Sequence, residues 1–252
     1  MKNIILKFIS VIIIFITIFI VYLSTIGIET NRFNDQIKSK VTESNRNLDL
    51  DLKKIKLKLD LFKFKISAKT VGATVFFLKR PLALEYIKIE VSLSSFIKNK
   101  INSSSIYVKT NSILIKDLIK FIRATNNKAE LFILEKTIQK GHIILDINLN
   151  TDDNGKILSD YEIKGLIKDT SINILNWAKF KNINLNFNLK KDEYFFKKIK
   201  FQLEKVNFIS EKINIKRKKD SFLIDGIVKN NQSSLNKNIF KLLKLNFKNI
   251  NL

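Results

Sequence analysis

Apolar and polar residues alternate one by one along most of the chain after residue 48. Because successive side chains of a β-strand point to opposite faces, strict alternation predicts strands with one apolar face and one polar face. The pattern therefore predicts a mainly-β protein with an antiparallel sheet and one or two short helices. The sheet is expected either to be an elongated, groove-like, curved one with a continuous apolar inner face or to belong to a closed sandwich. The clearest runs are Ile87, Ile89, Val91 and Leu93; Ile143, Leu145, Ile147 and Leu149; Ile183, Leu185, Phe187 and Leu189; Ile199, Phe201 and Leu203; and Ile213 and Ile215.

Turn and phase signals divide the alternating region. Asn154 and Gly155 form a strong hairpin signal, which predicts that 143–149 pairs with roughly 157–167. Two further turns are expected at 190–193 and 218–221. The alternation changes phase at Lys53 and Lys54, and again so that Phe62, Phe64 and Ile66 become its apolar members. We expect bulges or turns at these shifts, and we place Phe62 and Phe64 on the apolar face with Phe187, Phe201 and Phe222.

Two segments show helical spacing instead. Residues 112–124 carry apolar residues at i, i+3 and i+4, and 234–244 shows the same pattern more weakly. Residues 245–252 alternate again and stop without a turn, so we expect the sequence to be incomplete at its C-terminal end.

The N-terminal part contains an uncharged run at 8–28. As a helix this run would extend for about 30 Å, the thickness of a bilayer's hydrocarbon core. Lys2 and Lys7 precede it, and a short cationic flank favours a cytoplasmic N-terminus. The alternative is a cleaved signal peptide, whose apolar region is usually shorter and ends at small residues. We therefore expect a transmembrane anchor at 1–28, a polar amphipathic helix or linker at 29–47 and a β-rich region at 48–252.

The composition bears on partners and chemistry. The chain carries 46 Lys and Arg against 23 Asp and Glu, a net charge of +23, which attracts anionic surfaces such as nucleic acid or lipid headgroups. Most lysines alternate with the apolar residues, whereas nucleic-acid binding needs aromatic and basic side chains on one face, so we expect no nucleic-acid partner. There is no Cys, and His142 is the only His, which we interpret as structural, so we expect no metal and no cofactor. No catalytic motif occurs, and the acidic pairs at 49 and 51 and at 152 and 153 suit a solvated strand and a turn; we expect no enzyme.

The order of these parts resembles the N-terminal portion of the AsmA/TamB-like envelope proteins. The resemblance rests on the anchor, the polar helix, and the segments LDLDLKKIKLKLDLFKFKI, LALEYIKIEVSLSSFI, IKDLIKFIRA and KGHIILDINLNTDDNGKILSDYEIKGLIKD, with SSFIKNKINSSSIYV as the most characteristic stretch. The resemblance implies a single-pass inner-membrane protein with a periplasmic β-groove, apolar inside and polar outside, that carries phospholipid between membranes. Members of the family are commonly much longer than this chain.

We therefore expect membrane phospholipid as a partner, with other envelope proteins as further candidate partners. Alternation has the same period in an open groove and in a closed sandwich, so two functions remain open. An open groove would favour a lipid-handling protein. A closed sandwich would favour a ligand-free envelope scaffold or an outer-membrane protein assembly factor. The expected groove-lining residues are Ile183, Leu185, Phe187, Ile199, Phe201, Leu203, Ile213 and Ile215.

Overall fold

The computed structural model describes residues 2–98, 104–125, 128–153, 156–174, 178–219 and 221–230. Its helices are α1 (Lys2–Thr25), α2 (Asn34–Ser44), α3 (Leu93–Ile97), α4 (Ile115–Thr125) and α5 (Ala129–Thr137). Its first strands are β1 (Ile28–Thr30), β2 (Leu48–Asp51), β3 (Ile55–Asp60), β4 (Lys65–Val71), β5 (Thr74–Phe77), β6 (Arg80–Ser92), β7 (Ser104–Thr110) and β8 (Ile113–Leu114). The remaining strands are β9 (Ile138–Asn150), β10 (Glu162–Ile174), β11 (Ala178–Leu189), β12 (Glu193–Leu203), β13 (Val206–Lys218), β14 (Ser221–Gly226) and β15 (Lys229–Asn230).

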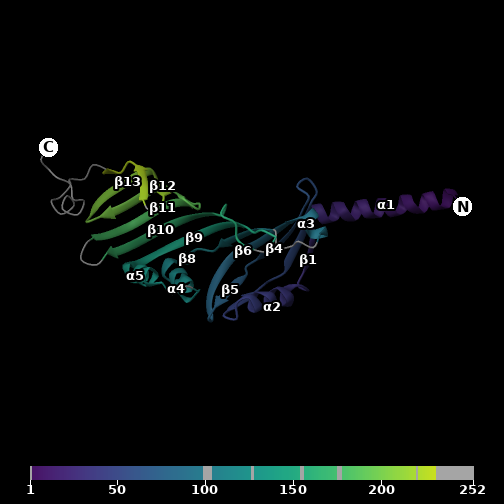
Figure 1. Ribbon diagram of the computed structural model, residues 1–252, viewed down its shortest axis with the longest axis horizontal. Coiled ribbons are helices and arrows are strands. Elements are labelled where there is room, and N and C mark those ends of the chain that lie inside the picture. Colours follow the sequence, from purple (N-terminus) through teal and green to yellow (C-terminus); the bar gives the residue numbers. More distant parts are fainter. Residues whose placement is uncertain are drawn as a thin grey trace. The chain divides into compact units, whose positions relative to one another are not determined.

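The described strands belong to one open, antiparallel sheet, as the alternation predicts. Its main path runs in the order β1-β3-β4-β6-β7-β9-β10-β11-β12-β13-β14 (Figure 1). From β9 to β14 each strand lies beside the next one in the sequence, so this part is a serial meander, and β15 pairs with β13. The mainly-β fold class with an N-terminal apolar helix and few short helices is therefore confirmed.

The chain divides into two compact units. Unit 1 comprises Met1–Phe76, Leu84–Val108 and Asn148–Ser159, and unit 2 comprises Phe77–Ala83, Lys109–Ile147 and Asp160–Leu252. In unit 1, β1, β3, β4 and β6 pair in register, and α2 lies against β2. The Asn34 side chain ties α2 to this strand region by donating hydrogen bonds to the carbonyl oxygens of Leu52 (3.1 Å) and Lys53 (3.0 Å).

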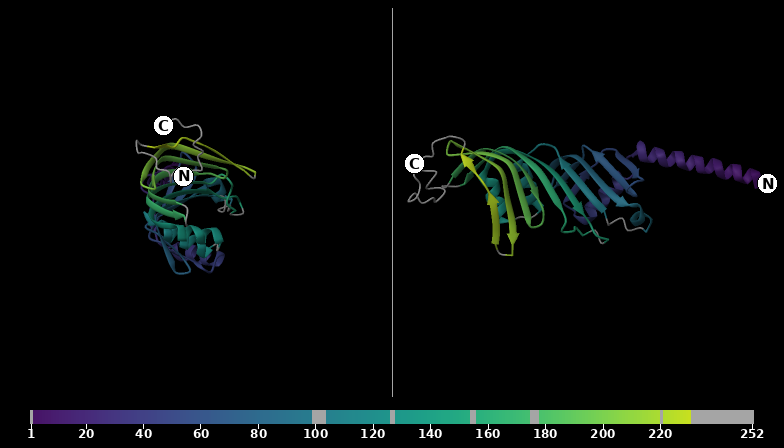
Figure 2. Two further views of the ribbon diagram at one scale, coloured as in Figure 1. Left: turned by 90° about the vertical axis from the view of Figure 1, so that its left-hand side faces the viewer. Right: turned by 90° about the horizontal axis from the view of Figure 1, so that it is seen from above.

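Unit 2 is a curved sheet of β9–β14 with α4 on one face, drawn from teal to yellow in Figure 2. α4 is amphipathic, and its inward residues Ile115 and Ile119 are buried. α5 follows directly and is held to α4 by the ion pair between Arg123 and Glu135. The Arg123 guanidinium also lies over the ring of Phe132, 5.0 Å from its centroid.

A row of irregular residues crosses four neighbouring strands of unit 2. Gly141 of β9, Asp169 of β10, Asn182 of β11 and Lys198 of β12 all have positive φ, at 140°, 49°, 51° and 52°. The pairing register shifts beside three of them, which marks β-bulges. Asn184 braces the row, because its Oδ1 accepts a hydrogen bond from the Asp169 backbone N–H (3.2 Å) and its Nδ2 donates one to the Asn182 carbonyl (2.9 Å). Bulges bend a strand locally, so this bulge row lies where the sheet of unit 2 curves.

Several local expectations are confirmed. The chain turns at 190–193 and 218–221, between β11 and β12 and between β13 and β14. The helix expected at 112–124 is α4. The expected pairing across Asn154 and Gly155 is present, with the strand itself beginning at Glu162 and an isolated bridge joining Thr151 and Ile157. Asn154, Gly155 and the helix expected at 234–244 lie outside the described residues.

Other expectations are wrong. Phe62 and Phe64 do not belong to the apolar face, because 61–64 forms the turn between β3 and β4 and both rings are exposed. Phe64 has a φ of 50°, which suits a turn and not a strand. Leu93 begins α3 and does not continue the strand before it. The alternation-based analysis also missed α5, whose apolar residues show no helical stripe and are exposed or only half-buried.

Candidate functional site: the apolar face of unit 2

The strand register places most apolar residues of β10–β14 on one face. Residues directly opposite each other in an antiparallel pair project to the same side of the sheet. Phe187 is opposite Phe196, and Phe196 is opposite Ile213, so three successive strands contribute to one side. Ile215 continues this line onto β14, where it is opposite Ile224. We call this side the apolar face of unit 2.

The bulge row keeps the apolar residues of each strand on this face. Without an extra residue, Ile199 would lie on the opposite side of β12 from Phe196, because three positions separate them. The bulge at Lys198 takes up the odd residue, and Ile199, Phe201 and Leu203 stay on the apolar face. On β13, the alternation of buried and exposed residues also shifts by one position, at the two exposed residues Glu211 and Lys212. The apolar residues of β13 therefore stay opposite those of β12.

Part of the apolar face is a closed core under α4. Phe187 is 8% exposed and packs in one cluster with two residues of the helix and three of β9. The members of this cluster are Ile115, Ile119, Ile138, Ile143, Leu145 and Phe187. The Phe187 ring lies over Gly165 of β10, where it occupies the space that a Cβ would need. No ligand can occupy this part without displacing α4.

A second cluster lies further along β11, β12 and β13. It contains Ala178, Leu203, Val206 and Phe208, with Phe180 and Phe201 packed against them. The Phe201 ring stacks on Phe208 with a centroid distance of 5.2 Å and is tilted against Phe180 at 5.9 Å. All six residues come from the sheet itself, so this aromatic cluster is formed within one layer.

The apolar face becomes exposed towards β14. Ile213 and Ile215 are half-buried, and Ile224 on the next strand is 66% exposed. Phe222, which is opposite Arg217 on the same face, is also exposed. At this end of the strands, exposure therefore rises from the α4-covered core to β14, whose residues are all exposed.

The opposite face is polar and bears ion pairs. Glu162 accepts hydrogen bonds from Lys164 (2.7 Å) and Asn188 (2.8 Å), and these bonds, with the charges of Lys164 and Lys190, hold the pKa of its carboxyl below its usual value. Between β12 and β13, the Lys216 ammonium donates a hydrogen bond to the Glu193 carboxylate at 2.8 Å. This hydrogen bond and charge pair lowers the pKa of Glu193 and raises the pKa of Lys216. Such groups keep their charge in water, which makes this the solvated side of the sheet.

A hollow of about 400 Å³ lies on this polar face over Gly165. It has a mixed lining, with Ile144, Leu166 and Phe195 beside Asp146, Lys164 and Lys197.

All eight residues expected to line a groove project to the apolar face, but they differ in what surrounds them. Phe187 and Leu185 belong to the core under α4, and Phe201 and Leu203 belong to the aromatic cluster. Ile199 is buried, whereas Ile183, Ile213 and Ile215 are half-buried. The most exposed members of the face, Phe222 and Ile224, were missed as lining residues, although alternation across the turn at 218–221 indicates them.

The isolated polar residues of the sequence stay apart. His142 is exposed on β9, opposite Leu114. Among the described residues, no three His, Asp or Glu side chains lie close enough together to hold a metal ion. Trp177 lies outside the described residues.

Comparisons with known proteins yield no relative. No family model matches the chain, no curated protein matches it, and no solved structure matches it.

Proposed function

We propose that this chain is a membrane-anchored protein that handles phospholipid on the apolar face of unit 2. The observation that carries the proposal is the increasing exposure of one continuous apolar face, from 8% at Phe187 to 66% at Ile224. Acyl chains gain about 0.8 kcal/mol for each methylene that leaves water, so an exposed apolar strip binds them without a specific contact. The charged opposite face keeps the other side of the sheet in water.

The order of parts supports a placement among AsmA/TamB-like envelope proteins. α1 contains the stretch Lys7–Thr25, which is long and apolar enough to cross a membrane. α2 is polar, and serial antiparallel hairpins follow it. On this proposal α1 lies in the inner membrane with its N-terminus in the cytoplasm, and the strands and short helices that follow α1 lie in the periplasm.

Ile224→Asp is expected to reduce bound lipid strongly, because it places a carboxylate on the exposed part of the apolar face. The measurement is native mass spectrometry of the full chain purified from membranes, which counts co-purified phospholipid. The matched control is Leu223→Asp, one position along the same strand. Leu223 is also exposed, but it lies opposite Lys216 on the polar face.

Both substitutions are at exposed positions, so neither should alter the β signal in circular dichroism. Lipid lost in the Ile224 variant and kept in the Leu223 variant supports the proposal. Equal lipid in both variants, or none on the wild type, would contradict it.

The topology is tested separately. A reporter that is active only in the periplasm, fused after residue 230, should be active, because Lys2 and Lys7 hold the N-terminal flank in the cytoplasm. A fusion at the same position to a reporter that works only in the cytoplasm should be silent. The reverse pattern would contradict the proposed orientation.

A ligand-free scaffold or assembly factor is the second candidate. The observation that favours it is the closed core under α4, which shows that the sheet fills part of its own apolar face. Wild-type protein that never carries lipid, with an unfolding midpoint unaffected by added phospholipid, is the result that this candidate expects.

A further inference from the structure

The turn between β3 and β4 exposes an unusual set of apolar side chains. Phe62 is 97% exposed, Phe64 is 67% exposed, and Leu61 lies beside them. The short helix α3 adds Ile97 at the same end of the strands, since the Leu93 backbone N–H donates to the Phe64 carbonyl at 2.7 Å. These four side chains, Leu61, Phe62, Phe64 and Ile97, form what we call the hairpin tip. Aromatic rings that stay exposed at a turn contribute no free energy from burial, so the hairpin tip is a candidate contact site for an apolar partner.

The hairpin tip lies at the end of unit 1 from which α1 leaves (Figure 1). β1, directly after α1, pairs with β3, and Ile28 is opposite Leu57. The connection is close, because a Cβ at Gly27 would overlap the Leu57 carbonyl oxygen and Gly27 has a φ of 79°. Ser24 of α1 and Phe62 line the same hollow of about 650 Å³. The tip is therefore level with the last turn of the apolar helix.

Lysines line the hollow that begins at the tip. They are Lys56, Lys58, Lys65, Lys69 and Lys88, against two carboxylates, Asp60 and Glu90. Lys58 and Lys65 lie nearest the turn, and the other three lie further along the strands. Lys63 in the turn and Lys98 after α3 are exposed as well.

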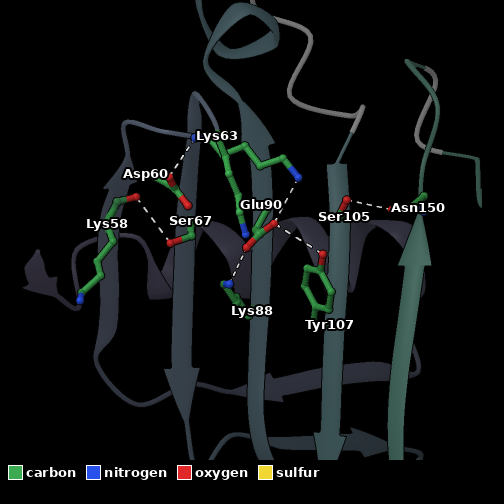
Figure 3. Close-up of polar contacts among 10 residues, drawn as sticks. Lys58, Asp60, Lys63, Ser67, Lys88, Glu90, Ser105, Tyr107 and Asn150 are labelled. Carbon is green, nitrogen blue, oxygen red and sulfur yellow. Dashed lines mark hydrogen bonds and ion pairs between the residues drawn. The ribbon is translucent and has the colours of Figure 1, made fainter. Parts of the chain in front are cut away.

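The two carboxylates are already engaged within the protein. Glu90 forms an ion pair with Lys88 (Figure 3) and a second one with Lys65 at 3.3 Å. Burial raises the pKa of the Glu90 carboxyl, but hydrogen bonds from these lysines and their charges outweigh it, and the pKa lies below its usual value. Asp60 accepts the Lys63 backbone N–H at 2.9 Å. Lys58 donates to the Thr25 carbonyl at 2.8 Å and so places one cation directly at the end of α1.

We propose that the hairpin tip is a second membrane contact: Leu61, Phe62, Phe64 and Ile97 enter the interface of the leaflet from which α1 emerges, and the neighbouring lysines bind its anionic headgroups. This proposal rests on the membrane anchor of the proposed function. Apolar side chains bordered by cations match a bilayer interface, where acyl chains lie directly beneath anionic headgroups. The tip would fix the orientation of unit 1 on the membrane surface, which a single helix cannot do.

The absence of Cys allows a direct test on the full chain. Single-cysteine variants Phe62→Cys and Val71→Cys carry a nitroxide label after reconstitution into vesicles of phosphatidylcholine and phosphatidylglycerol. Val71 is also apolar and exposed, and it lies at the other end of β4, about 20 Å away at 3.3 Å per residue. The label at Phe62 should collide several times more with oxygen, relative to a water-soluble nickel complex, than the label at Val71.

A third variant, Phe15→Cys in α1, separates this proposal from the anchor itself. The membrane contact is overturned, and the anchor left intact, if the Phe15 label lies within the bilayer while the Phe62 label is as accessible to the nickel complex as the Val71 label. A label at Phe15 that remains in water would overturn both. Vesicles of phosphatidylcholine alone test the lysines: insertion of the Phe62 label should weaken there, and unchanged insertion would refute the headgroup contact.

Discussion

Phe201→Asp is expected to destabilise unit 2 by about 3–5 kcal/mol, the cost of truncating a packed aromatic with a buried charge added. The Phe201 ring stacks on Phe208 and is tilted against Phe180, and a carboxylate there would replace these aromatic contacts with a charge. Chemical denaturation of the full chain in detergent, followed by circular dichroism, measures the change.

Lys200→Asp is the matched control for this variant. Lys200 is exposed on the polar face, one position before Phe201, and its replacement should alter stability by less than about 0.5 kcal/mol. Equal losses in the two variants would contradict the assignment of faces. Because Phe201 is part of a packed cluster, loss of lipid from its variant would not separate binding from folding, and the exposed Ile224 carries the ligand test instead.

Gly141→Ala is expected to be the second severe substitution. It should lower the free energy of unfolding by about 3 kcal/mol or more, because the backbone conformation is disfavoured for alanine and the new Cβ overlaps a neighbouring residue. Gly141 has a φ of 140°, and a Cβ would overlap the side chain of Thr170 and lie 2.8 Å from its Cα. Thr170 is itself buried and cannot move aside.

Gly72→Ala supplies the comparison, because Gly72 also has a positive φ, 70°, but its nearest neighbour is Lys53 Cγ at 4.0 Å. Gly72→Ala should lower the free energy of unfolding by about 1 kcal/mol, which is the cost of the disfavoured backbone conformation alone. The difference between the two variants measures how tightly the first strand of the bulge row packs on the second. Similar losses at both glycines would show that this packing is loose.

Alternation was sufficient to predict the sheet and its faces, because burial on one side imposes a period of two on every strand. Residues such as Phe187, Ile199 and Ile213 could be assigned to one face for that reason. The turns at 190–193 and 218–221 were also predictable, since charged residues there interrupt two alternating runs.

Other features of the fold could not be predicted from the alternation of apolar and polar residues. Phe62 and Phe64 continue the alternation but lie in a turn, because four residues are needed to connect β3 to β4. The closed part of the apolar face depends on where α4 packs, and no local pattern specifies which strands a helix covers. The bulge row does have a local signature, since adjacent polar residues at 168–169, 181–182 and 197–198 each interrupt the alternation by one position.

The bulge row also bears on how such a sheet can change over evolutionary time. Each strand in the row encodes its own bend, through a residue such as Asp169, Asn182 or Lys198, and does not depend on a single distant element to curve it. A hairpin duplicated within the gene would therefore bring its curvature with it and extend the same arc. Length and curvature are thus inherited separately, so duplication can vary the number of hairpins while the path of the apolar face stays the same.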